Sequence, residues 1–125
     1  MGLPPKNIFI PKNFELFQLK KEELIETPTK ILETAQSDVW YCFDTQFKLP
    51  KSEFFLNIYT NDEDYATNPK SNILADLWDD LFKKNFKDVK YLAERADQKF
   101  FSQMKRNRIF INAYGYNDTL HLLIE

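Results

Sequence analysis

The sequence predicts an α+β fold, in which an antiparallel sheet of two strands and a later hairpin packs with one long helix. Apolar and polar residues alternate in two segments before residue 61 and in two more after residue 97, and a helical stripe lies between them. The 125 residues include twelve Phe, six Tyr and two Trp, which supply large apolar areas for a core. A chain of this length holds one domain or part of one.

Residues 1–37 are predicted to form an extended arm that precedes a domain in residues 38–125. The arm is punctuated by prolines, namely Pro4, Pro5, Pro11 and Pro28. Each proline restricts the residue before it to extended geometry. We expect the short apolar pieces between them to pack along a surface, and the arm to extend away unless other parts of the molecule hold it. The stretch 29–34 is too short and too mixed to assign.

Two strands are predicted over residues 39–47 and 53–60, separated by a break at residues 48–51. Strand-forming side chains occupy alternate positions in each segment: Val39, Tyr41 and Phe43 in the first, and Phe54, Leu56 and Ile58 in the second. Because the connection is short, we expect the two strands to be antiparallel neighbours.

One long helix is predicted over residues 69–96, with a bend near Asn85. Asn68 and Pro69 are an N-cap followed by proline at the first helical position. Apolar residues then recur at helical spacing, namely Ile73, Leu74, Leu77, Trp78, Leu81, Phe82, Phe86, Val89, Leu92, Ala93 and Ala96. The opposite, charged face includes two favourably ordered pairs one turn apart, Asp79 with Lys83 and Asp80 with Lys84.

A hairpin is predicted from residues 98–104 and 108–116, joined by the polar turn Lys105–Arg108. We expect Gly115 to end its second strand and a short helix to occupy residues 120–125. The apolar run in that helix would have little to bury against at a true C-terminus, so the chain is expected to be cut from a longer one.

Composition excludes several functions. The seventeen basic and nineteen acidic residues give a net charge of −2, which argues against a dedicated nucleic-acid binder. With only two glycines there is no glycine-rich phosphate loop. The single cysteine cannot form an internal disulfide, which fits a reducing compartment such as the cytoplasm. No apolar run approaches the roughly 20 residues of a membrane span.

Candidate metal ligands are few. His121 is the only histidine, and with Cys42 it cannot supply the three or four ligands of a zinc site. We interpret His121 as a surface or partly buried helix residue and Cys42 as a strand residue. The acidic run Asp62–Asp64 has oxygen ligands for a divalent ion but lacks the spacing of a calcium loop, so a solvated loop is preferred.

Basic residues form two candidate patches. Aromatic residues interleave with Lys83, Lys84, Lys87 and Lys90, which could bind a polyanion. The same pattern is expected of any amphipathic helix, which is the preferred interpretation. The turn Lys105–Arg108 is interpreted as solvated. The triplet Asn117–Thr119 fits a glycosylation acceptor, but nothing in the sequence marks secretion.

An ordered set of motifs resembles the insulinase (pitrilysin-type, inverzincin) zinc metallopeptidases. The set consists of Asn7-Ile8-Phe9-Ile10-Pro11-Lys12-Asn13-Phe14, Val39-Trp40-Tyr41, Phe47-x-Leu49-Pro50-Lys51, Tyr65, Asn68-Pro69, the long helix and Gly115-Tyr116-Asn117-Asp118. The resemblance implies enzymes with four related α+β domains in two halves, joined by an extended linker. Residues 1–37 would be this linker, and residues 38–125 the first part of the middle (third) domain.

The resemblance also implies what this segment does. In the family, the first domain carries His-x-x-Glu-His, whose histidines bind zinc and whose glutamate polarises a water for attack on a peptide bond. The corresponding helix here has no histidine, so no catalytic or metal residue carries over, and the substrate-binding residues are unknown. The whole protein would be a peptide-degrading zinc metalloendopeptidase, and this segment would help to form its substrate chamber beside the remaining domains.

The alternative is a peptide- or polyanion-binding interaction module from a catalytically inactive relative. Two departures from the family pattern leave the activity of the whole protein open. Cys42 stands where a basic residue is common, and the turn Lys105–Arg108 is unusually basic.

Overall fold

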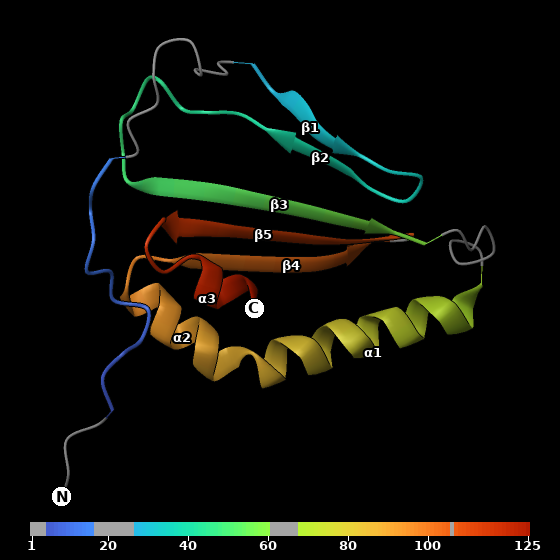
Figure 1. The fold of residues 1–125 in the computed structure, drawn as a ribbon. Coiled ribbons are helices and arrows are strands. Elements are labelled where there is room, and N and C mark those ends of the chain that lie inside the picture. The colour runs from blue at the N-terminus through green and yellow to red at the C-terminus, as the bar shows by residue number, and fades with distance from the viewer. Residues whose placement is uncertain (1–4, 17–26, 61–67, 106) are drawn as a thin grey trace, which may run out of the picture. The chain divides into compact units, whose positions relative to one another are not determined.

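The computed structural model describes residues 5–16, 27–60, 68–105 and 107–125, which belong to two compact units (Figure 1). Unit 1 combines residues 1–14 with 51–125, and unit 2 comprises residues 15–50. The predicted acidic run Asp62–Asp64 lies outside the described residues, as does Arg106 of the basic turn.

Unit 2 contains an antiparallel hairpin of β1 (Thr29–Glu33) and β2 (Asp38–Tyr41). The Thr34 hydroxyl accepts hydrogen bonds from the N–H groups of Gln36 and Ser37, at 3.2 and 2.9 Å, and so closes the turn. The Lys30 ammonium pairs with Glu33 at 3.1 Å and with Asp38 at 3.3 Å. These local contacts hold the two short strands in register.

The expected pairing of residues 39–47 with residues 53–60 is wrong. The first segment is a strand only as far as Tyr41, and its partner is β1, which the sequence pattern left unassigned. The connection between β1 and β2, residues 34–37, is shorter than the connection 42–50 between β2 and β3, so closing it costs less chain entropy. The second segment pairs with a strand far along the chain instead.

Unit 1 is built on a three-stranded antiparallel sheet in the order β3-β5-β4. The predicted hairpin is confirmed as β4 (Lys99–Lys105) and β5 (Arg108–Tyr116). The predicted second strand is β3 (Lys51–Tyr59), which pairs with β5 along its whole length. The alternation of apolar and polar residues therefore predicted these three strands. Their order follows from β5, which pairs with both of the others at the centre of the sheet.

The predicted long helix is present as α1 (Pro69–Asn85) and α2 (Lys87–Arg95), which meet at Phe86, next to the expected bend. The Asn68 side chain accepts from the N–H of Lys70 at 3.0 Å and caps α1 as expected. Helical hydrogen bonds continue on both sides of Phe86, to Phe82 and from Lys90. The two helices therefore form one bent segment.

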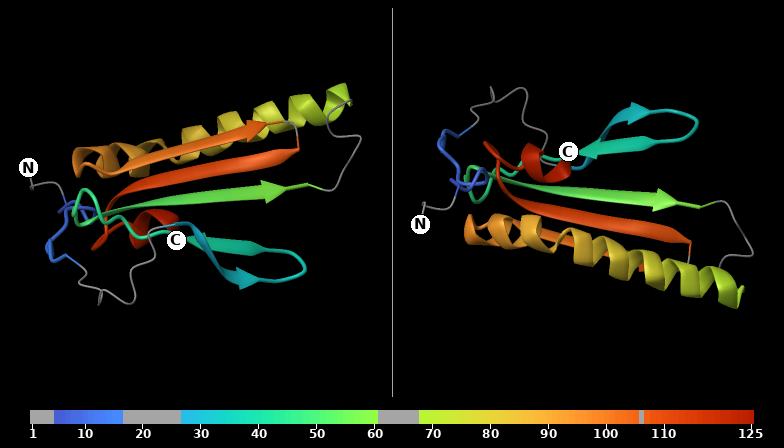
Figure 2. Two further views of the ribbon diagram at one scale, coloured as in Figure 1. Left: turned by 90° about the horizontal axis from the view of Figure 1, so that it is seen from above. Right: turned by 90° about the horizontal axis from the view of Figure 1, so that it is seen from below.

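Both helices contact β4 and cover one face of the sheet (Figure 2). A run of aromatic rings connects the helices to the sheet. Successive ring centroids lie 5.2 Å apart between Trp78 and Phe82, 5.6 Å between Phe82 and Phe86, and 4.5 Å between Phe86 and Phe100. Phe100 is opposite Ala113 of β5, which is opposite Phe54 of β3. These residues therefore mark the face of the sheet that the helices cover.

The end of α2 is fixed by a left-handed residue and an ion pair. Asp97 has φ of 58°, a conformation that Asp tolerates better than most residues, and the next N–H, of Gln98, returns to the carbonyl of Ala93 at 3.0 Å. The Lys51 ammonium at the start of β3 donates to Asp97 at 2.6 Å. The shared hydrogen bond raises the pKa of Lys51 and lowers the pKa of Asp97.

Large apolar side chains remain exposed on two surfaces of unit 1. On α1, the exposed apolar residues are Ile73 (67%), Leu74 (56%), Leu77 (53%) and Leu81 (51%). On the sheet face away from the helices, Phe55 and Phe101 flank Phe110 with centroids 6.3 and 6.1 Å away. Phe55 is 59% exposed and Phe101 is 49% exposed. Unit 1 therefore covers only some of the apolar side chains in the stripe on α1.

Candidate functional site

The predicted metal-ligand candidates do not come together in the described structure. His121 is the exposed first residue of the short C-terminal helix α3 (His121–Ile124), at the position where a helix was expected. Cys42 is exposed and directly follows β2, so it lies just outside the strand that we expected to hold it. Among the described residues, no three His, Cys, Asp or Glu side chains are grouped so as to hold a metal ion.

The four lysines of the predicted polyanion face are exposed along the end of α1 and along α2. Lys83 forms the expected ion pair with Asp79 at 2.5 Å, and Lys90 pairs with Glu94 at 3.9 Å. Lys84 and Lys87 make no ion pair with any described residue, so the expected Asp80 partner of Lys84 is not engaged. Polyanion binding by this face stays a prediction.

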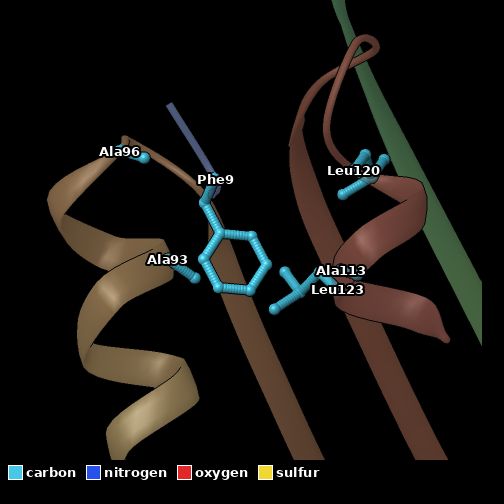
Figure 3. Close-up of a cluster of buried hydrophobic side chains, with 6 residues drawn as sticks. All are labelled: Phe9, Ala93, Ala96, Ala113, Leu120 and Leu123. Atoms are coloured by element: carbon cyan, nitrogen blue, oxygen red, sulfur yellow. The ribbon is translucent and has the colours of Figure 1, made fainter. Parts of the chain in front are cut away.

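Residues 7–14, which we call the strap, contact α2, β5 and residues 118–123 of unit 1. The ring of Phe9 is 2% exposed and enters a socket on the helix-covered side (Figure 3). The socket is lined by Ala93, Ala96, Ala113, Leu120 and Leu123. Because three of these residues are alanines, helix, sheet and α3 leave room for one aromatic ring between them.

The carbonyl of Phe9 is held by two buried side chains. It accepts from Nε2 of Gln98 at 3.2 Å and from the hydroxyl of Thr119 at 3.1 Å. Gln98 Nε2 also donates to the same hydroxyl. Gln98 is fully buried, and its Oε1 has no hydrogen-bond partner among the described residues. If the Gln98 amide were flipped, its Oε1 would face the Phe9 carbonyl, and two acceptors cannot form a hydrogen bond. The bond to the strap therefore fixes the orientation of the amide.

A carboxylate holds the next part of the strap. Asp118 Oδ2 accepts from the N–H groups of Lys12 and Asn13 at 2.8 and 3.2 Å. The bond from Lys12 has the larger effect on the pKa of Asp118, followed by the bond from Asn13, and together they hold this pKa below its ordinary value. At the other end, Asn7 Nδ2 donates to the carbonyl of Leu92 at 2.7 Å. The ring of Phe14 also lies edge-on to the ring of Tyr116, with centroids 5.3 Å apart. The strap is therefore attached at several points along its length.

Gly115 is required by the close approach of Gln98. A Cβ at residue 115 would lie 2.7 Å from Cγ and 3.3 Å from Cα of Gln98. The strand does not end at this glycine as expected, because β5 continues to Tyr116. The role of Gly115 is to make space for the buried amide that binds the strap.

The expectation that the arm extends away from the domain is wrong for the strap. Its one large buried side chain, Phe9, reaches a core of residues that are distant in sequence. Local sequence patterns gave Gln98 and Phe9 no functional role, and they indicated no contact between Asn117–Thr119 and the arm. The sole available signal was the motif set of the family resemblance, which includes both the strap and Asp118.

We expect the Asp118→Asn variant to lose a pH-dependent part of the stability. Docking lowers the pKa of Asp118 from an ordinary value of 3.8, so the carboxylate's contribution is present above that value and is lost as pH falls through the lower pKa of the folded chain. Urea unfolding at several values between about pH 5 and pH 2 measures this. The wild type should lose more stability than the variant, and identical pH dependence in both would contradict the assignment.

These features define an α+β segment in which helices cover one face of an antiparallel sheet and an N-terminal strap completes the core. The family model described as the middle or third domain of peptidase M16 matches residues 1–125. The chain therefore belongs to the peptidase M16 family, the insulinase and pitrilysin family of zinc metallopeptidases. The expected resemblance is confirmed.

The relatives are much longer proteins. The chain is 33% identical over 123 residues to insulin-degrading enzyme of Bos taurus, covering 98% of this chain and 12% of that protein. It is 27% identical over 125 residues to nardilysin of Mus musculus, covering 100% of this chain and 10% of that protein. A crystal structure of pitrilysin shares the fold, with a TM-score of 0.83 and 23% identity over 99% of this chain and 13% of that one.

The zinc ion that the family implies does not fit the residues present here. One histidine occurs in the whole sequence, so the two-histidine motif cannot be assembled from these residues. The described part of the chain groups no alternative set of three donors. None of the described helices is long and apolar enough to cross a membrane.

Proposed function

We propose that this chain is a non-catalytic part of a zinc metalloendopeptidase that degrades peptides, and that it helps to form the chamber holding the substrate. The observation that carries this proposal is the match of the middle-domain family model to residues 1–125. The wide coverage of the chain by longer peptidase relatives supports it. The chemistry of peptide cleavage would then belong to another part of the same protein.

Within that protein, we assign residues 1–37 to the linker between the two halves and residues 38–125 to the first part of the middle domain. The prolines of residues 1–37 support the linker assignment, because each restricts the residue before it to extended geometry. The exposed stripe of α1, from Ile73 to Leu81, supports packing against the remaining domains. The aromatic row Phe55, Phe110 and Phe101 offers a second apolar surface.

The proposed partners are peptide substrates and the other domains of the same enzyme, with zinc held outside this chain and no nucleic acid bound. We place the enzyme in the cytoplasm, although one matched relative in Arabidopsis thaliana is named as peroxisomal. A net charge of −2 agrees with the absence of a nucleic-acid partner.

Peptide hydrolysis by the full-length protein tests the proposal. We expect cleavage of a fluorogenic peptide that a chelator abolishes and added zinc restores, because the family's cleavage chemistry depends on a zinc-activated water. The isolated 125-residue chain should not cleave the same peptide. Hydrolysis that persists in the full-length protein after zinc removal, or cleavage by the isolated chain, would contradict it.

A further inference from the structure

We propose that the strap is detachable: residues 7–14 leave their socket together while the sheet β3-β5-β4 and the helices remain folded. The socket is then a binding site for a peptide segment that presents one aromatic anchor from a turn, and its occupant is the chain's own strap. This proposal concerns a conformational equilibrium and does not depend on peptidase activity.

The first argument is the kind of contact that holds the strap. The contacts that attach it to the rest of unit 1 use side chains: the Phe9 ring in its socket, the Phe14 ring against Tyr116, and the side-chain groups of Asn7, Gln98, Asp118 and Thr119. Among the described residues, the ladders of the sheet run only between β3, β5 and β4. Releasing the strap therefore breaks no strand pairing.

The second argument is that the socket is held in shape without the strap. Ala93 is fixed in α2, and Ala113 is fixed in the central strand β5. Gln98 is positioned by its own N–H bond to the Ala93 carbonyl, and its amide still reaches the Thr119 hydroxyl. Both partners of the Phe9 carbonyl therefore stay at the socket, and the returning carbonyl selects the amide orientation of the docked state.

The third argument is that one anchor dominates the strap. Ile8, Ile10 and Phe14 are 64%, 47% and 55% exposed, whereas Phe9 is 2% exposed. Pro11 follows Ile10 and restricts it to extended geometry, which limits the conformations that the strap explores after release. A segment with one buried side chain and a stiff centre leaves and returns as a unit.

Hydrogen exchange of the full-length protein, followed by mass spectrometry, tests this inference. Peptides covering residues 5–16 should exchange through an opening that depends weakly on denaturant, because it exposes little surface. Peptides from β5 should exchange more slowly, through an opening that depends steeply on denaturant. Asp118→Asn should speed exchange in the strap about tenfold and leave β5 unchanged, because a neutral amide oxygen accepts the two bonds from Lys12 and Asn13 more weakly than the carboxylate does.

The matched control is Asp80→Asn, an acid-to-amide change on α1 at a residue without an ion pair to any described residue. It should leave exchange of the strap unchanged. Strap and β5 peptides that exchange in one step with equal denaturant dependence would overturn the proposal. So would an Asp118→Asn variant that accelerates both segments equally, because the strap would then be an inseparable part of the core.

Discussion

Phe9→Ala is expected to lower the free energy of unfolding of the 125-residue chain by about 3 kcal/mol. The substitution empties a socket in which the ring is 2% exposed and contacts Ala93, Ala113 and Leu123 (Figure 3). Lost burial of the ring and the remaining cavity both contribute to the effect. Urea unfolding followed by far-ultraviolet circular dichroism measures it.

The matched control for this substitution is Ile8→Ala. Ile8 is the adjacent residue and is 64% exposed, so its truncation should change the stability by no more than about 0.5 kcal/mol. If Phe9→Ala were as mild as the control, Phe9 would not anchor the strap. Phe9→Leu, which keeps part of the buried volume, should fall between the two and provides a reading if the alanine variant is too unstable to purify.

Gly115→Ala is expected to cost about 2 kcal/mol, within the range for overpacking a closely packed site. The added methyl would lie 2.7 Å from Cγ and 3.3 Å from Cα of Gln98, whose side chain is fully buried. Moving Gln98 would also lengthen its bonds to Phe9 and Thr119. Urea unfolding of the variant measures the loss.

A double-mutant cycle with Gln98→Ala separates this mechanism from a general effect on β5. Without Cγ at residue 98, the worst contact disappears, so Gly115→Ala should cost less in the Gln98→Ala background than in the wild type. We expect a coupling energy of about 1 kcal/mol or more. Additive effects would mean that Gly115 has a role unrelated to the buried amide.

Local patterns predicted most elements of unit 1. Asn68 and Pro69 specify the start of α1 because capping is a property of adjacent residues. The alternation around the turn at 105–108 specifies β4 and β5 because a hairpin brings sequence neighbours together. The same alternation could not choose the partner of β2, since a period of two identifies the face of a strand and not its neighbour.

The strap site depends on contacts that no local pattern contains. The Phe9 carbonyl and the Thr119 hydroxyl are 110 residues apart in the chain, and Gln98 is 89 residues from Phe9. Gln98 is the polar first residue of the predicted strand 98–104, and the structure buries it fully. Its burial is tolerable because the strap satisfies its amide donor, and that requires the tertiary fold.

The zinc content of the full-length protein carrying His121→Ala tests the central claim most directly, because this claim puts the catalytic centre outside the chain. His121 is the only histidine of these 125 residues and is exposed on α3. We predict wild-type zinc stoichiometry and undiminished peptide hydrolysis in the variant. Loss of bound zinc together with hydrolysis, in a variant that remains folded by circular dichroism, would place the centre in this segment and contradict the account.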